Sequence, residues 1–128
     1  MRQIFRIAVY ISFIWNLVLV IGVVLGSKFA LPRAAGGQFD SFPIAIRVLY
    51  VFTTIFVIYQ FVISIRFFQK SIIEKLWILR ILTIISIFSA VINLLSPSSL
   101  EKWNSIPALI IASSFFYQQR SHKEPNDV

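Results

Sequence analysis

The sequence predicts an all-α protein, an integral membrane four-helix bundle, and three observations predict it. Of the 128 residues, 58% are hydrophobic and 13% are charged, whereas soluble domains have about 45–50% apolar and about 25% charged residues. The charges are separated by uncharged runs close to the roughly 20 helical residues that cross a hydrocarbon core. Each run also has polar or small side chains at helical spacing. The composition excludes a water-soluble monomer, a disordered chain and, since cysteine is absent, a secreted disulfide miniprotein.

The first helix is predicted over residues 4–26. Its uncharged run, 7–27, has 21 residues, enough for one crossing. Arg2 and Arg6 precede this run, as basic residues precede the apolar region of a secretory signal peptide. That region is only about 7–15 residues long in signal peptides. We therefore expect a retained helix, with cleavage near residues 24–26 as the alternative.

The second helix is predicted over residues 42–67, after a linker that spans residues 27–41. The linker contains proline and a Gly-Gly pair, which interrupt helices. Asp40 or Ser41 is expected to cap the second helix, with Pro43 in its first turn, where the missing N–H is harmless.

The third and fourth helices are predicted over residues 72–95 and 99–118. Both follow a Ser-x-x-Glu sequence, at Ser71–Glu74 and at Ser98–Glu101. In such a capping box the serine accepts from the third backbone N–H, and the glutamate side chain accepts from the serine N–H. We therefore expect both helices to begin at these serines.

The fourth helix has the shortest uncharged run, 17 residues over 103–119, and Pro107 lies inside it. Proline is tolerated in membrane helices where neighbours satisfy the freed carbonyl, so we expect a kinked crossing. The alternative is an interfacial helix up to Ser105, with the span starting near Pro107. The polar tail, residues 120–128, is expected to be disordered.

Lysine and arginine are unevenly distributed between the two ends of the predicted spans. If the N-terminus is cytoplasmic, eight lie on the cytoplasmic side: Arg2, Arg6, Arg66, Lys70, Lys75, Arg80, Arg120 and Lys123. Four lie on the opposite side: Lys28, Arg33, Arg47 and Lys102. Because cytoplasmic loops are rich in these residues, we expect a multi-pass protein of the plasma (inner) membrane with both termini cytoplasmic. Nucleic acid is excluded as a partner despite the net charge of +7, because the cations are not clustered on one face.

Polar side chains at helical spacing mark one face of each predicted helix. Such faces turn inward in membrane bundles, where amides and hydroxyls bond across helices. The residues that we single out are Asn16 in the first helix, Thr53 and Gln60 in the second, and Ser86 and Asn93 in the third. We interpret them as interhelical hydrogen-bonding groups; the alternative is that they line a path for a substrate.

Gly22 and Gly26 form a GxxxG pattern, which permits close approach of helix backbones. We expect them to contact another helix of the same bundle, with dimerisation as the alternative. Arg47 and Arg80 lie near the start of their predicted helices, where arginine extends to the interface or binds lipid phosphate.

The sequence lacks the residues of most catalytic and cofactor sites. It has no cysteine and one histidine, His122 in the tail, so haem, iron–sulfur and thiolate sites are not expected. A catalytic site would depend on Asp40, Arg33 and Arg47, which include no nucleophile. We expect no enzyme activity, no cofactor and no bound metal. No Asp or Glu lies deep in a span, so we also expect no proton-coupled transport.

The stretch Asn93–Glu101, followed by Trp103 and Pro107-Ala108, resembles the junction between the third and fourth helices of short bacterial four-span integral membrane proteins of unknown function. The resemblance covers about the last third of the chain and implies four spans and a bacterial origin. By size and number of spans the chain is also similar to small multidrug-resistance transporters. These need a carboxylate in the first helix, where this chain has Asn16.

Two functions are compatible with these features. The first is a small multi-pass membrane protein without catalytic chemistry, an accessory or structural envelope protein that acts through lipid or protein contacts. Its partners would be membrane lipids, a second copy of the chain or a larger membrane complex. The alternative is a small oligomeric transporter or channel whose path is lined by the polar faces of the second and third helices. A cavity that reaches Gln60 and Asn93 favours the alternative, and a dry bundle favours the first.

Overall fold

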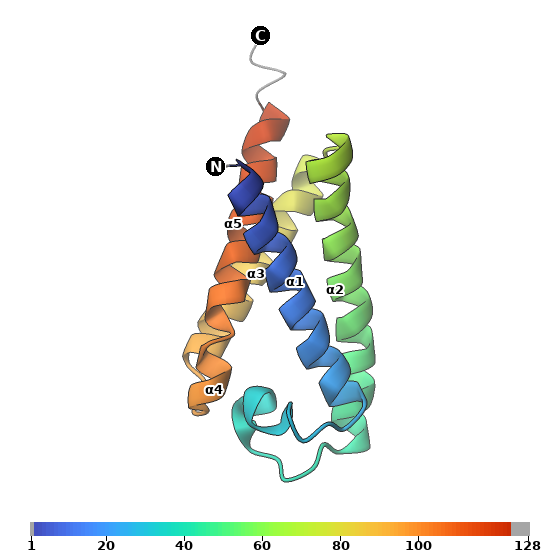
Figure 1. Cartoon of the computed structure of the whole chain (residues 1–128), viewed down its shortest axis with the longest axis vertical. Coiled ribbons are helices and arrows are strands. Elements are labelled where there is room, and N and C mark those ends of the chain that lie inside the picture. The colour runs from blue at the N-terminus through green and yellow to red at the C-terminus, as the bar shows by residue number, and fades with distance from the viewer. Residues whose placement is uncertain (1, 124–128) are drawn as a thin grey trace.

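A computed structural model describes residues 2–123 of the chain and confirms the all-α fold. The described part contains four long helices, one short helix and two 3-10 turns (Figure 1). In chain order these are α1 (Arg2–Val24), η1 (Leu31–Arg33), η2 (Ala35–Gly37), α2 (Ile44–Lys70), α3 (Leu76–Leu94), α4 (Ser99–Lys102) and α5 (Ser105–Lys123).

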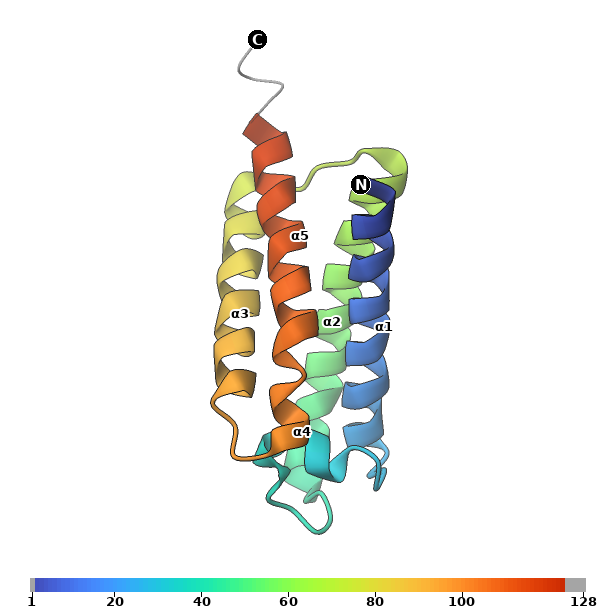
Figure 2. The same ribbon diagram turned by 60° about the vertical axis from the view of Figure 1, so that its left-hand side comes forward.

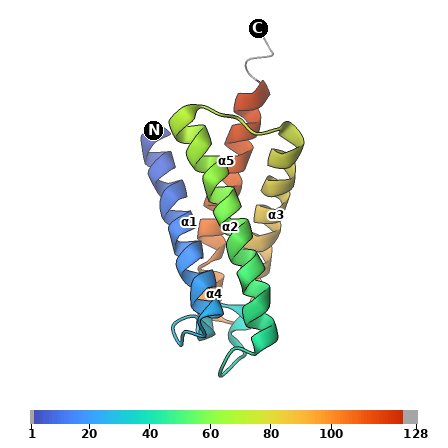
Figure 3. The same ribbon diagram turned by 90° about the vertical axis from the view of Figure 1, so that its right-hand side faces the viewer.

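The four long helices lie side by side as two packed pairs. α1 packs along α2, α3 packs along α5, and α1 also contacts α5 between the pairs (Figure 2). α2 and α3 are consecutive, yet they are not one of the closely packed pairs. Figure 3 shows them apart near the termini end, and Figure 1 shows them apart toward the linker end. The start of α1 and the end of α5 lie at one end of the bundle, which we call the termini end. The linker and α4 lie at the other, the linker end.

An aromatic core fills the half of the bundle nearer the termini end. The rings of Phe13 and Phe61 stack with their centroids 5.0 Å apart, and the ring of Phe115 meets that of Phe13 edge-on at 6.3 Å. Phe13 and Phe115 are fully buried. The core therefore fills the centre of this half with packed apolar side chains.

The outer surface of the bundle is apolar. Ile84, Phe52 and Phe88 are each about two thirds exposed, and many other isoleucine, leucine and valine side chains are also exposed. In water, so much exposed apolar surface would promote aggregation, whereas in lipid it has no such cost. Three helices (α1, α2 and α3) are long and apolar enough to cross a membrane. The chain is thus a small multi-pass membrane protein.

α5 is not one of these three helices because of its polar residues. Two of them, Ser114 and Gln118, are fully buried inside the bundle rather than exposed to lipid. α5 nevertheless runs alongside the other long helices (Figure 2). A fourth crossing by this helix stays a prediction.

The predicted capping box at the start of the third helix is wrong. α2 continues to Lys70, and Ser71 ends it in a left-handed conformation (φ 55°) with its N–H bonded to the Phe67 carbonyl at 3.1 Å. Glu74 precedes α3, which begins at Leu76, and forms a 3.9 Å ion pair with Arg66. Because Ser71 terminates α2, it is not available to cap α3.

The predicted cap of the second helix is also wrong. The residue that precedes α2 is Pro43, and no side chain caps this end. Proline disfavours helical conformation in the residue before it, here Phe42, so the helix cannot extend back to Asp40 or Ser41. Phe42 instead packs in a small apolar cluster with the linker.

The single fourth helix over 99–118 is wrong, because the chain breaks at Trp103–Asn104 between α4 and α5. The alternative placed the start of the span near Pro107, two residues from the observed start of α5 at Ser105. Pro107 lies in the first turn of α5, where its missing N–H disrupts no helical bond.

Half of the second capping box is confirmed. The Ser98 hydroxyl accepts from the Glu101 N–H at 3.3 Å. The Glu101 carboxylate does not bond to the Ser98 N–H, which donates to Ser96 Oγ at 3.1 Å.

The predicted start of the polar tail is wrong as well. α5 continues to Lys123, so residues 120–123 are helical rather than disordered. The rest of the tail, 124–128, lies outside the described residues.

Candidate functional site

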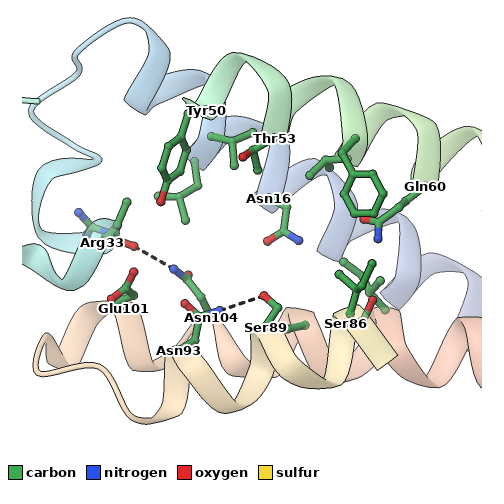
Figure 4. Close-up of a pocket in the computed structure, with 18 of the residues that line it drawn as sticks. Asn16, Arg33, Tyr50, Thr53, Gln60, Ser86, Ser89, Asn93, Glu101 and Asn104 are labelled. Carbon is green, nitrogen blue, oxygen red and sulfur yellow. Dashed lines mark hydrogen bonds between the residues drawn. The ribbon is translucent and has the colours of Figure 1, made fainter. Parts of the chain in front are cut away.

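A cavity of about 370 Å³ lies in the half of the bundle nearer the linker end, where α2 and α3 lie apart (Figure 4). Its wall comes from α1, the linker, α2, α3, α4 and α5. The residues with polar or charged side chains on this wall are Asn16, Arg33, Tyr50, Thr53, Gln60, Ser86, Ser89, Asn93, Glu101 and Asn104. A second hollow toward the surface shares five of the lining residues, Tyr50, Ile85, Ser89, Asn93 and Glu101, so the cavity opens between α2 and α3.

Five of the residues singled out from the sequence line this cavity together: Asn16, Thr53, Gln60, Ser86 and Asn93. Figure 4 shows the amides of Asn16 and Gln60 directed into the space between the α2 and α3 ribbons. Gln60 is 5% exposed, and among the described residues neither amide has a hydrogen-bond partner. Asn93 donates to Ser89 Oγ at 3.5 Å within its own helix. Within the described chain, none of these three amides bonds across helices.

Glu101 is the charged residue that the sequence analysis assigned to a helix cap and that the structure brings to the cavity. It is 8% exposed. Its Oε1 accepts from the Gly36 N–H at 3.0 Å and from the Ser96 hydroxyl. No Lys or Arg lies within ion-pairing distance of this carboxylate in residues 2–123. Sequence reasoning missed it because no sequence signal links Gly36 to a residue 65 positions away.

Asn104 holds the linker against the helices at the base of the cavity. Its Oδ1 accepts from the Trp15 indole N–H at 2.9 Å, and its Nδ2 donates to the Arg33 carbonyl at 3.0 Å. The Arg33 guanidinium lies 4.2 Å from the Phe29 ring centroid and donates to the Phe29 carbonyl at 2.8 Å. As Figure 4 shows, the carbonyl of Arg33 faces Asn104 while its guanidinium points away from the cavity.

The two glycines of the GxxxG pattern form the end of α1. The Ser27 N–H bonds to the Gly22 carbonyl at 2.8 Å, and the Gly26 N–H bonds to the Val23 carbonyl at 3.0 Å. Gly26 has a φ of +72°. These are the bonds and the left-handed residue of a Schellman motif, which terminates helices.

The neighbours of these glycines come from α2 and from the linker. A Cβ on Gly22 would lie 3.3 Å from the Ala30 Cβ in the linker, and one on Gly26 would lie 3.5 Å from the guanidinium carbon of Arg47 in α2. Gly26 thus faces another helix of the bundle, as expected, whereas Gly22 faces the linker. The linker folds back over the end of α1 and occupies the position beside Gly22.

The two arginines expected near lipid phosphate have different surroundings. Arg47 is half-buried, and its Nε donates to the Val24 carbonyl at 2.8 Å. This bond satisfies one of the free carbonyls at the end of α1. Arg80 is exposed near the start of α3, without an ion pair or hydrogen bond among the described residues. Phosphate binding at either residue stays a prediction.

No protein-family model, curated protein or solved structure matches this chain. The resemblance of the junction around Asn93–Glu101 to short bacterial four-span proteins therefore assigns no family. The function is argued below from the cavity and the residues on its wall.

Proposed function

We propose that this chain is a small membrane solute carrier, which binds a polar solute in the cavity between α2 and α3 from the linker end. Gln60 is the main support for the proposal. An amide buried without a hydrogen bond costs about 1–3 kcal/mol, and buried polar groups in proteins are nearly always bonded. The Gln60 amide is open to the cavity and bonds to nothing in the described part of the chain, so its partner is a molecule in the cavity, which in this proposal is the solute.

The size and wall of the cavity fit a small solute. Ligand pockets have volumes of roughly 300–1,000 Å³, and this cavity of about 370 Å³ is at the lower end of that range. Apolar side chains, such as Leu19, Val20 and Phe56, alternate on the wall with amides and hydroxyls. This mixture suits a molecule with both hydrogen-bonding and apolar parts.

The aromatic core favours a carrier over an open channel. Phe13, Phe61 and Phe115 pack together in the core, and we infer that they interrupt a continuous path from the cavity to the termini end. Polar groups also lie within the half of the bundle that this core fills. Gln118 is fully buried, and its Nε2 lies 3.4 Å from Ser64 Oγ, while its Oε1 has no partner among the described residues. Alternating access requires that one binding site opens to each side in turn, and these polar groups would line the path from the cavity to the termini side in the other state.

The positive-inside rule gives the direction of loading in this proposal. With both termini cytoplasmic, the linker end lies on the outer side of the membrane, and the solute enters from there. The proposal involves hydrogen bonding and charge only, and no covalent step.

An accessory or structural role is the second candidate, favoured by the extensive apolar surface of α2 and α3. That surface suits lipid, a second copy of the chain or another membrane protein. An accessory or structural role does not account for the polar cavity, and we therefore rank this role second.

Single-cysteine labelling tests the proposal, because the chain contains no cysteine. Ser86→Cys places a thiol on the cavity wall, and Ile84→Cys, the control, places one on the exposed apolar face of the same helix. A charged, water-soluble thiol reagent reacts with the thiolate and so requires water. We expect it to label Ser86→Cys from the linker side only and to leave Ile84→Cys unlabelled. An unreactive Ser86→Cys would mean a dry bundle and would contradict the proposal.

A second labelling experiment distinguishes transport from binding, and it uses a residue in the half of the bundle nearer the termini end. Ser64 is fully buried in that half, next to Ile63 of the core. During solute exchange we expect slow labelling of Ser64→Cys by reagent added at the termini side. If Ser86→Cys reacts and Ser64→Cys never does, the chain binds a solute without transporting it.

A further inference from the structure

We infer that the solute is an organic cation whose ammonium or guanidinium group binds the Glu101 carboxylate. The inference rests on the proposed function and names its substrate class. It starts from the negative charge of Glu101. A helix cap does not require this charge, and the neutral amides of the cavity do not compensate it.

The hydrogen bonds of Glu101 involve only one of its two oxygens. Oε1 accepts from the Gly36 N–H at 3.0 Å and from the Ser96 hydroxyl. Oε2 takes part in neither of these bonds and is not enclosed by the chain. A neutral glutamine oxygen would accept the same two bonds, so the contacts to Gly36 and Ser96 do not require a negative charge.

The negative charge is buried without a compensating cation in the described chain. Glu101 is 8% exposed, and the nearest charged residue on the cavity wall, Arg33, directs its guanidinium at Phe29. Burying an unpaired carboxylate is costly, and proteins normally pair such charges. A cationic ligand group at Oε2 would supply both the missing charge and the missing donor.

The rest of the cavity favours an organic cation over a metal ion. Ca²⁺ takes six to eight oxygen ligands, commonly from several carboxylates, whereas the described residues contain no group of three or more His, Cys, Asp or Glu side chains. The amides of Asn16 and Gln60 and the apolar side chains of Val20 and Phe56 line the cavity with Glu101. They suit the polar and apolar parts of a larger molecule.

Trp15 is a built-in reporter of binding at this site. Its indole N–H donates to Asn104, which is on the cavity wall. The chain has three tryptophans, and Trp77 and Trp103 are both exposed. The double variant Trp77→Phe/Trp103→Phe therefore leaves Trp15 as the single fluorophore.

The experiment titrates this variant of the full chain in lipid nanodiscs with three probes of similar shape: phenethylammonium, 2-phenylethanol and 3-phenylpropanoate. We expect affinity to decrease from the ammonium to the alcohol to the carboxylate. A charge-assisted hydrogen bond predicts a preference of about tenfold to hundredfold for the ammonium over the alcohol.

Two isosteric substitutions test which carboxylate causes the preference for the ammonium. Glu101→Gln keeps the acceptor for Gly36 and Ser96, and we expect it to abolish the preference for the ammonium while the alcohol binds as before. Glu74→Gln, the control, removes the same charge at the other end of the bundle, where Glu74 pairs with Arg66. We expect it to leave the preference unchanged.

The outcomes separate this inference from the proposed function. If the ammonium and the alcohol bind the unsubstituted cavity equally, or if Glu74→Gln and Glu101→Gln have equal effects, the inference is wrong and the solute-binding proposal stands. If none of the three probes changes the Trp15 signal and Ser86→Cys is unreactive, both fail. Should Glu101→Gln not fold, the order of the three affinities in the unsubstituted cavity still decides the sign of the charge.

Discussion

Asn104→Ala is expected to destabilise the bundle by detaching the linker from the helices. Asn104 is 4% exposed and makes two hydrogen bonds, one from Trp15 at 2.9 Å and one to the Arg33 carbonyl at 3.0 Å. These bonds join α1, the linker and the start of α5. Alanine removes both and leaves an indole N–H and a backbone carbonyl without partners.

The expected loss is about 1–3 kcal/mol of unfolding free energy. Hydrogen bonds contribute about 0.5–1.5 kcal/mol each in soluble proteins and about 0.6 kcal/mol on average in a membrane bundle. Asn93→Ala is the matched control, because Asn93 lies on the same cavity but makes one bond of 3.5 Å within α3. We expect it to cost about 0.5 kcal/mol or less.

The assay is equilibrium unfolding in mixed detergent micelles, followed by the fluorescence of Trp15 in the Trp77→Phe/Trp103→Phe variant. The bond from Trp15 to Asn104 also predicts a change in the folded-state emission of Asn104→Ala. Equal destabilisation by Asn104→Ala and Asn93→Ala would refute the view that Asn104 anchors the linker.

Four further predictions concern the end of α1, the arginines and the two membrane faces. Gly26→Ala should cost about 1–2 kcal/mol in unfolding experiments, because φ is +72°, while Gly26→Asn should cost less because asparagine tolerates this conformation; equal losses would contradict the assignment. Arg47→Ala should lower stability by about 1 kcal/mol by freeing the Val24 carbonyl, whereas exposed Arg80→Ala should not. Reporter fusions after residue 128 and between Gly36 and Gly37 should report cytoplasm and exterior, and the reverse result would invert the orientation. Liposomes that contain the protein should retain an imposed pH gradient when no organic cation is present, since the aromatic core separates Glu101 from the termini end until a solute is exchanged; dissipation without a solute that Glu101→Gln abolishes would show that this carboxylate is reached from both sides in the resting protein.

The helical spacing of polar residues predicted which side chains share one space. Asn16, Thr53, Gln60, Ser86 and Asn93 come from three helices, and all five line the cavity. Their spacing sets the side of each helix on which they lie, and the cost of exposing amides to lipid turns those sides inward. That argument is local to each helix, which is why it succeeded.

The errors at helix ends have a different origin. Ser71–Glu74 and Ser98–Glu101 have the same capping pattern, but in one the serine ends the preceding helix and in the other it begins a new one. The pattern describes the bonds that a serine can make, and the length of α2 decides which of them it makes. Gly26 likewise ends α1, while the same spacing is also typical of packed helices.

The contacts of the linker could not be predicted from the sequence because they join residues far apart in the chain. Gly36 bonds to Glu101 and Arg33 bonds to Asn104, 65 and 71 positions away. Both bonds depend on the linker folding back under the bundle. The same fold-back brings the Glu101 carboxylate to the cavity wall, and a sequence pattern that assigned Glu101 to a cap gave no reason to expect it there.

The separation of α2 from α3 is the reason that we favour a path for a solute over the other interpretation of the polar residues. If these helices packed together, Gln60 and Asn93 would meet neighbouring polar groups and would act as interhelical hydrogen-bonding residues. Because the packed pairs are α1 with α2 and α3 with α5, the polar sides of α2 and α3 face a shared space. Amides there have bonding capacity that the described chain does not use, and Glu101 adds a charge that it does not neutralise. These free amides next to an unpaired carboxylate are the features on which our inference of a small-cation site rests, and packing of the helices does not require them.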